Sequence, residues 1–140
     1  MKTPKAKIMG INTVLPHEQI HEDALLELLN QIKKDGKLLR PIAIDKNTKI
    51  IIDGHHRTEA LKRLGCKYIS VYEFDYQNSN IEMKQTMSES PTNKTILIKK
   101  TLEGFIFPAK STRHIVKIND TSVHISELET IHSIKLSELF

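Results

Sequence analysis

The chain has 140 residues, of which 39% are hydrophobic and 27% are charged, and its formal net charge at pH 7 is +4. This length and composition are typical of one globular domain. No apolar run approaches the roughly 20 residues that a membrane span needs, and the single cysteine, Cys66, excludes an internal disulfide. The mild positive charge is compatible with nucleic acid and equally with a small anionic ligand such as a nucleotide.

We expect a cytoplasmic protein. The first ten residues carry lysines but no apolar segment of signal-peptide length, and a single cysteine fits a reducing compartment. Cys66 follows Gly65, which ends a predicted helix, so this thiol is expected to fill a gap in the core rather than to react.

The first half of the chain predicts strands that alternate with helices. Residues 11–15, which end before Pro16, predict a short strand, and residues 22–34 place apolar side chains at helical spacing. Two unbroken apolar runs, at 42–45 and 50–52, are separated by a loop of hairpin length. Because neither run alternates with polar residues, we expect both faces of this hairpin to be covered.

A helix is predicted at residues 55–64 and a strand at 68–74. Residues 77–93 are rich in Asn, Ser, Thr and Gln and predict a flexible connection inside a single domain that covers residues 1–140. A further helix is expected at 93–103, capped by Thr92.

The C-terminal part predicts a strand at residues 114–118 after a loop at 108–112. Residues 123–125 are expected to pair with that strand, and the tail at 127–140 is expected to be a short helix or an irregular cover. Together these elements predict an α/β or α+β fold, a small mixed sheet with packed helices.

A run of polar residues, Asp-Gly-His-His-Arg, stands where a predicted strand passes into a predicted helix. Unpaired N–H groups and the dipole at a helix start attract anions, and Gly54 allows a close approach. Arg57 offers a donor fork suited to phosphate, and His55 and His56 can donate hydrogen bonds. Asp53 beside a phosphate is best explained by holding Mg²⁺. We interpret the motif as a phosphate cradle.

An ordinary surface helix is the alternative for this motif. Asp53 would then cap the helix, and Arg57 would pair with Glu59 or Glu22. The convergence of four polar side chains on one helix start favours a ligand site. Zinc binding by the two histidines is disfavoured because neighbouring residues on a helix diverge by about 100°, and Cys66 is the only thiol.

Residues 50–72, IIIDGHHRTEALKRLGCKYISVY, resemble the nucleotide-binding signature of the ParB/sulfiredoxin-like superfamily. Sulfiredoxins carry a reactive cysteine where this chain has His55, so sulfinic-acid reduction is not expected. CTP-binding partition proteins carry Glu-Arg-Arg after the glycine and continue into a helix-turn-helix domain, a pattern that is missing from this sequence.

Three motifs in order are similar to the free L-serine kinase branch, which phosphorylates the amino acid to O-phospho-L-serine. They are LPHEQI at 15–20, DGHHR at 53–57 and FPAKSTRHI at 107–115. This resemblance implies Mg²⁺ and either ADP or ATP as phosphoryl donor. The chain departs from the family in having no tryptophan near the expected substrate position.

By this resemblance Glu18 is the general base, and Lys110, Thr112, Arg113 and His114 hold the substrate. Without the resemblance, residue types alone would not favour Glu18 over other nearby acids. Residues 110–114 would then be interpreted equally well as a basic surface loop.

Arg40 is implied as a second nucleotide-binding residue, with a solvated arginine before a proline as its alternative. His17 and His21 are interpreted as surface or supporting residues rather than as metal ligands.

The alternative function is a non-catalytic, ParB-like nucleotide-binding or DNA-associated regulatory module. The basic residues of this chain are dispersed and no basic recognition helix is evident, so nucleic acid is not expected as a partner. A ParB-like nuclease would need clustered metal-binding acids, and Asp53 is the only acid placed to begin such a cluster.

Overall fold

The structure is a computed structural model that describes residues 2–86 and 92–140. Its helices and strands follow one another along the chain as β1 (Lys7–Gly10), η1 (Ile11–Thr13), α1 (Glu22–Asp35), β2 (Lys37–Leu38), β3 (Ile42–Asp45), β4 (Ile51–Asp53), α2 (His55–Arg63), β5 (Tyr68–Phe74), β6 (Ile81–Gln85), α3 (Lys94–Leu102), β7 (Thr112–Ile118), β8 (Thr121–His124), η2 (Ile125–Leu128), β9 (Ile134–Lys135) and η3 (Leu136–Glu138).

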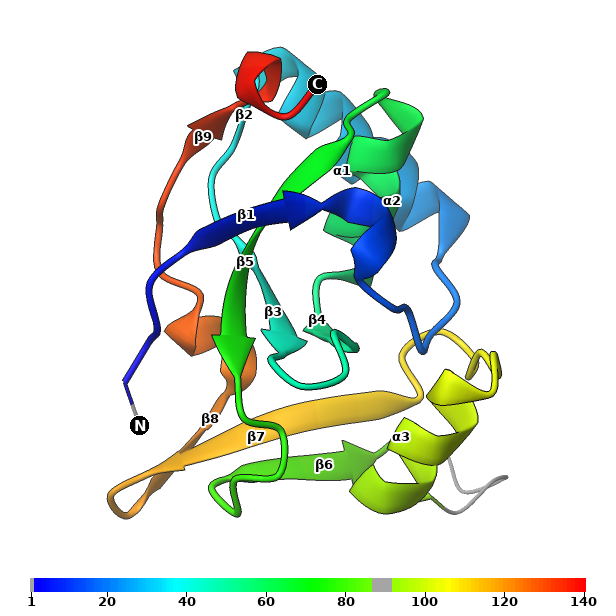
Figure 1. The fold of residues 1–140 in the computed structure, drawn as a ribbon, viewed down its shortest axis with the longest axis vertical. Helices are drawn as coiled ribbons and strands as arrows, with labels where there is room; N and C mark the ends of the chain where they lie inside the picture. The colour runs from blue at the N-terminus through cyan, green and yellow to red at the C-terminus, as the bar shows by residue number, and fades with distance from the viewer. Residues whose placement is uncertain (1, 87–91) are drawn as a thin grey trace.

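A four-stranded sheet in the order β1-β5-β3-β4 lies at the centre (Figure 1). β3 and β5 are parallel, whereas β3 and β4 form the predicted antiparallel hairpin. Successive side chains of β3 enter different clusters, because side chains alternate across a strand. Ile42 and Ile44 pack with the cluster beneath α1 and α2, and Ala43 packs with the cluster on the other face. The expectation that both faces are covered is confirmed.

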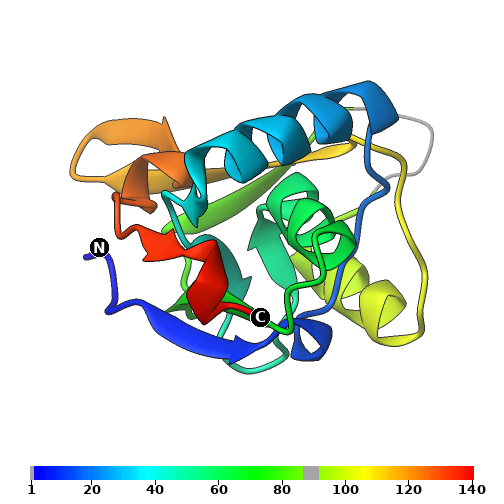
Figure 2. The same ribbon diagram turned by 90° about the horizontal axis from the view of Figure 1, so that it is seen from above.

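Helices α1 and α2 cover one face and lie side by side (Figure 2). Both helices were predicted within one residue of their observed ends. An ion pair of 2.5 Å between Arg63 Nη1 and Glu22 Oε1 joins them across the surface. Because both side chains are well exposed, this pair adds little to stability.

The other face packs against a second sheet, β6-β7-β8, together with α3 (Figure 1). β7 and β8 form the expected hairpin, with Val116 opposite Val123. In the stretch expected to be a connection, the structure places strand β6, which pairs antiparallel with β7. Ile81 is its one fully buried anchor, so the local sequence carries little strand pattern. Residues 87–91 of that stretch lie outside the described residues.

Two local predictions are wrong. Residues 11–15 are not a strand: β1 ends at Gly10 and a 3₁₀ turn follows. Ile11 and Val14 are both buried, and residues three apart share one side in a 3₁₀ turn but not in a strand. The cap of α3 is not Thr92. Asn93 Oδ1 accepts the backbone N–H of Ile96 at 2.9 Å, because its side chain reaches the first helical turn.

The C-terminal tail has regular secondary structure. It contains two 3₁₀ turns and strand β9, which pairs with β2. Leu139 is fully buried, and its carbonyl oxygen accepts the backbone N–H groups of Lys67 and Tyr68. Cys66 lies in the same cluster, and burial raises the pKa of its thiol, in agreement with a packing role. Within the described residues, no helix is long and apolar enough to cross a membrane.

Candidate active site

A hollow of about 420 Å³ is lined by residues from all three sequence motifs. Glu18 comes from the segment before α1, residues 53–57 surround the start of α2, and Arg113 comes from the beginning of β7. Lys110, Thr112 and His114 also line this hollow, so it includes every predicted site residue except Arg40.

Backbone hydrogen bonds explain why these distant segments meet. The segment that carries Glu18 first runs beside β4, where Ile51 N–H donates to the Leu15 carbonyl at 2.8 Å. It then runs beside Phe107, whose N–H donates to the His17 carbonyl at 2.7 Å. The segment is thereby fixed between the strand that leads to α2 and the loop that leads to β7.

The Glu18 carboxylate is tightly held. Its Oε1 accepts the backbone N–H of Lys110 at 2.7 Å, and its Oε2 accepts both the hydroxyl and the backbone N–H of Thr112. His17 Nε2 lies 3.4 Å from Oε2, and the side chain of Glu18 is 11% exposed. Burial alone raises the pKa of Glu18, but hydrogen bonds from His17, Thr112 and Lys110 outweigh it and leave the pKa below its ordinary value. The carboxyl is therefore ionised at neutral pH.

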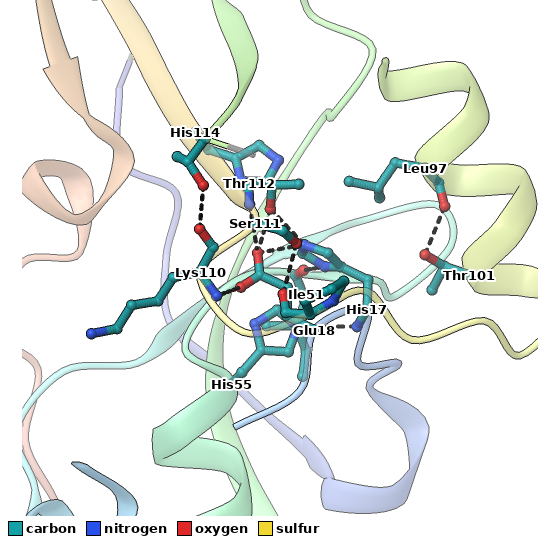
Figure 3. Close-up of polar contacts among 12 residues, drawn as sticks. His17, Glu18, Ile51, His55, Leu97, Thr101, Lys110, Ser111, Thr112 and His114 are labelled. Carbon is teal, nitrogen blue, oxygen red and sulfur yellow. Dashed lines mark hydrogen bonds and ion pairs between the residues drawn. The ribbon is translucent and has the colours of Figure 1, made fainter. Parts of the chain in front are cut away.

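Lys110 contributes through its backbone. Its φ of 58° is left-handed, a conformation that costs a non-glycine residue of the order of 1–2 kcal/mol. This turn directs the N–H at Glu18, while the side chain extends away from the carboxylate (Figure 3). The strained backbone of Lys110 is therefore coupled to the position of the Glu18 carboxylate.

Both histidines of the DGHHR motif act as acceptors. His55 Nε2 accepts the backbone N–H of His17, and His56 Nε2 accepts that of His21, each at 3.0 Å. A ring nitrogen that accepts a hydrogen bond carries no proton, so both rings are neutral with the proton on Nδ1. Burial above all lowers the pKa of each ring, strongly at His55. The two rings therefore attach the Glu18 segment to the start of α2.

The guanidinium of Arg57 has protein partners on both of its terminal nitrogens. Nη1 donates to the Arg40 and Pro41 carbonyls at 3.0 Å, and Nη2 contacts Asp53 at 3.2 Å and Glu129 at 2.6 Å. The fork predicted for phosphate thus organises the entry to β3 and orients Asp53.

Glu129 was not expected from the sequence. It is almost fully buried, and its Oε2 has no hydrogen-bond partner among the described residues. Burial raises the pKa of Glu129 to about 8; the Arg57 guanidinium partly offsets this rise and Asp53 adds to it. An isolated glutamate just after a 3₁₀ turn carries no sequence signal that would distinguish it from exposed neighbours.

Gly54 is required by packing as well as by backbone conformation. Its φ is 117°, and a Cβ at this position would lie 2.4 Å from Cγ2 of Ile42. The turn from β4 into α2 therefore lies directly against β3. The first residues of α2 line the hollow. The unpaired backbone N–H groups of a helix start can attract an anion without any side chain.

His114 and Arg113 point in different directions from β7. His114 is 3% exposed and its Nε2 bonds to Tyr76 Oη at 2.7 Å. Burial lowers the pKa of His114 to about 3, so the ring is neutral and cannot hold a carboxylate by charge. Arg113 is exposed and lines the hollow. Of the two residues predicted to grip a substrate carboxylate, the geometry favours Arg113.

Arg40 lies at a neighbouring hollow. This second hollow, of about 430 Å³, lies between α1 and the chain around Glu129, and it shares Asp53 and Arg57 with the first. The side chain of Arg40 is exposed there.

Thr86 and His124, which line the first hollow, had no signal in the sequence.

Comparison with known proteins identifies the family. Residues 4–90 match the ParB N-terminal domain, and the chain belongs to this family. An ATP-dependent L-serine kinase of Staphylothermus marinus is 34% identical over 83 residues, which cover 55% of this chain and 32% of that protein. A ParB-like protein of Sulfolobus acidocaldarius is 36% identical over 69 residues, which cover 46% of this chain and 34% of that protein. The chain thus matches about a third of the length of these curated relatives.

A solved structure of a free serine kinase in complex with AMP has the same fold. It superposes with a TM-score of 0.80 over 99% of this chain and 95% of that chain, at 14% identity. At that identity the likeness shows the fold alone, and the predicted α+β architecture is confirmed. The resemblance to the serine kinase branch of the ParB-like superfamily is also confirmed by these relatives.

Proposed function

We propose that the protein is a nucleotide-dependent kinase that transfers a phosphoryl group from ADP or ATP to the hydroxyl group of free L-serine. The observation that carries this proposal is the shared hollow, in which an ionised, nearly buried carboxylate and the anion-binding start of a helix face the same space. Phosphoryl transfer needs positioned reactants and neutralised charge more than covalent help from the protein.

Glu18 is the proposed general base. The serine hydroxyl oxygen forms a bond to the terminal phosphorus of the nucleotide while the bond from that phosphorus to its bridging oxygen breaks. The hydroxyl proton passes to Glu18. Each carboxylate oxygen can accept two hydrogen bonds. Because Oε1 accepts the Lys110 N–H and Oε2 accepts two donors from Thr112, we assign the proton to Oε1.

The phosphates are proposed to bind the N–H groups of residues 55–57, with Arg40 acting on the nucleotide from the second hollow. Asp53 is the proposed Mg²⁺ ligand. It is partly exposed and lines the hollow, which fits an ion held by one carboxylate and by phosphates. In residues 2–86 and 92–140, no group of three or more His, Cys, Asp or Glu side chains could hold a metal alone. Bound Mg²⁺ would neutralise phosphate charge.

Arg113 is proposed to bind the serine carboxylate, because a guanidinium can form two parallel hydrogen bonds with it. Lys110 adds positive charge at the rim of the hollow, and its backbone joins Thr112 in holding the base. His114 forms part of the wall. The curated relatives that are named L-serine kinases support the proposal that the substrate is serine.

The decisive experiment incubates the purified protein with L-serine, Mg²⁺ and either ATP or ADP and measures phosphoserine by mass spectrometry. O-Methyl-L-serine, which has no hydroxyl proton, is the matched control substrate and is expected to give no phosphorylated product. Nucleotide binding without phosphoserine from either donor would instead favour the regulatory nucleotide-binding module, the class suggested by the ParB-like relative.

A further inference from the structure

The ring of His17 lies next to Glu18 and Thr112 (Figure 3). It is 1% exposed, and its Nδ1 lies 2.8 Å from the Ile51 carbonyl oxygen. Because a carbonyl oxygen only accepts, Nδ1 must carry a proton. Nε2 on the other side lies 3.1 Å from Thr112 Oγ1 and 3.4 Å from Glu18 Oε2.

Counting protons over these three groups leads to one conclusion. The Thr112 hydroxyl has a single proton and also bonds to Glu18 Oε2. If that proton points to Glu18, the contact between Thr112 and His17 needs a second proton on Nε2. If it points to His17 instead, the contact with Glu18 needs a proton on the carboxyl. The trio therefore holds one proton more than a neutral histidine and an ionised glutamate would have.

We propose that His17 is the doubly protonated member of this trio and the positioning residue that keeps Glu18 ionised, a role that rests on the proposed kinase function. Nε2–H then donates a hydrogen bond to Thr112 Oγ1 and faces Glu18, and the Thr112 hydroxyl in turn donates a hydrogen bond to Oε2. This arrangement occupies Oε2 and leaves Oε1 as the oxygen that receives the substrate proton.

The surroundings of the ring suit a single cation at His17. The ring of His55 packs against it edge-on at 4.5 Å between centroids, His114 lies at 5.9 Å and Phe107 at 6.4 Å. His55 is neutral because its Nε2 accepts the backbone N–H of His17. His114 is neutral because burial lowers its pKa to about 3. The charged group that faces the ring is thus Glu18, which has the opposite sign.

The direct test needs no turnover. Nitrogen-15 NMR of histidine-labelled protein, with the His17 signals assigned by loss in His17→Gln, is expected to show both ring nitrogens of His17 protonated near pH 7. An unprotonated Nε2 overturns the proposal, whether the extra proton is then found on Glu18 or is absent. This result stands even if the protein makes no phosphoserine, so a failure of the kinase assignment is distinguished from a failure of the His17 assignment.

The second test uses His17→Gln, whose amide can still donate toward Glu18 but carries no charge. An opposite charge at this distance lowers a carboxyl pKa by about one unit or more, so the acidic limb of the kcat–pH profile is expected to move up by about one pH unit. Activity on that limb then falls about tenfold and recovers at higher pH, with nucleotide affinity unchanged. His132→Gln, at an exposed histidine, is the control. A uniform loss at all pH values would indicate a merely structural role and overturn the proposal.

Discussion

Glu129→Gln is expected to flatten the pH dependence of folding stability. The carboxyl of Glu129 has a pKa of about 8 in the folded protein against an ordinary value of 4.5, chiefly because of burial. Between these two values the folded state holds a proton that the unfolded state has lost, so stability falls as pH rises. At about 1.4 kcal/mol per pKa unit, the penalty approaches about 5 kcal/mol above pH 8 and vanishes below pH 4.5.

Glutamine keeps the shape and the oxygen that accepts from Arg57, but it cannot ionise. The free energy of unfolding of Glu129→Gln relative to the unmodified protein should therefore increase by about 3 kcal/mol between about pH 5.5 and pH 8. Urea unfolding at several pH values measures this slope, which is independent of any constant cost of the amide. Glu127→Gln, at an exposed position of the 3₁₀ turn that precedes Glu129, should leave the slope unchanged. Parallel pH curves for Glu129→Gln and the unmodified protein would refute the reasoning and show that Glu129 is ionised beside Arg57.

Three further predictions concern the site and the turn that supports it. Glu18→Gln should lower kcat by about 10²–10⁴-fold while the nucleotide Kd from calorimetry stays the same, because the amide cannot take a proton; unchanged turnover would remove Glu18 from the mechanism. Arg113→Ala should raise the KM for serine by about tenfold or more through loss of charge-assisted hydrogen bonds, with nucleotide affinity intact; an equal loss of nucleotide affinity would contradict its assignment to the serine carboxylate. Gly54→Ala should destabilise the fold by about 2–4 kcal/mol in thermal unfolding, because its Cβ would overlap Ile42 and its φ is positive. Gly36→Ala is the control for φ alone, since a Cβ there meets nothing within 4 Å.

Local patterns were sufficient for the helices and for the central hairpin. The apolar spacing of α1 and α2 and the unbroken runs of β3 and β4 report directly on burial, because periodicity reflects which face an element covers. Strand β6 escaped prediction because a strand paired with β7 by backbone hydrogen bonds needs few apolar side chains of its own. The segment at residues 11–15 holds only three apolar residues, too few to define a period, so its sequence does not distinguish the 3₁₀ turn at 11–13 from a strand.

The sequence by itself determined that a helix start rich in polar side chains follows a buried strand at residues 53–57, and its motifs singled out Glu18 by resemblance. Only the tertiary structure decided what those side chains touch. Arg57 meets Glu129 across 72 positions of sequence, and Glu18 meets Thr112 across 94. Local spacing carries no information on contacts at such separations, because they depend on how strands and loops pair in space. The protonation states of His55 and Glu129 follow from those contacts and from burial.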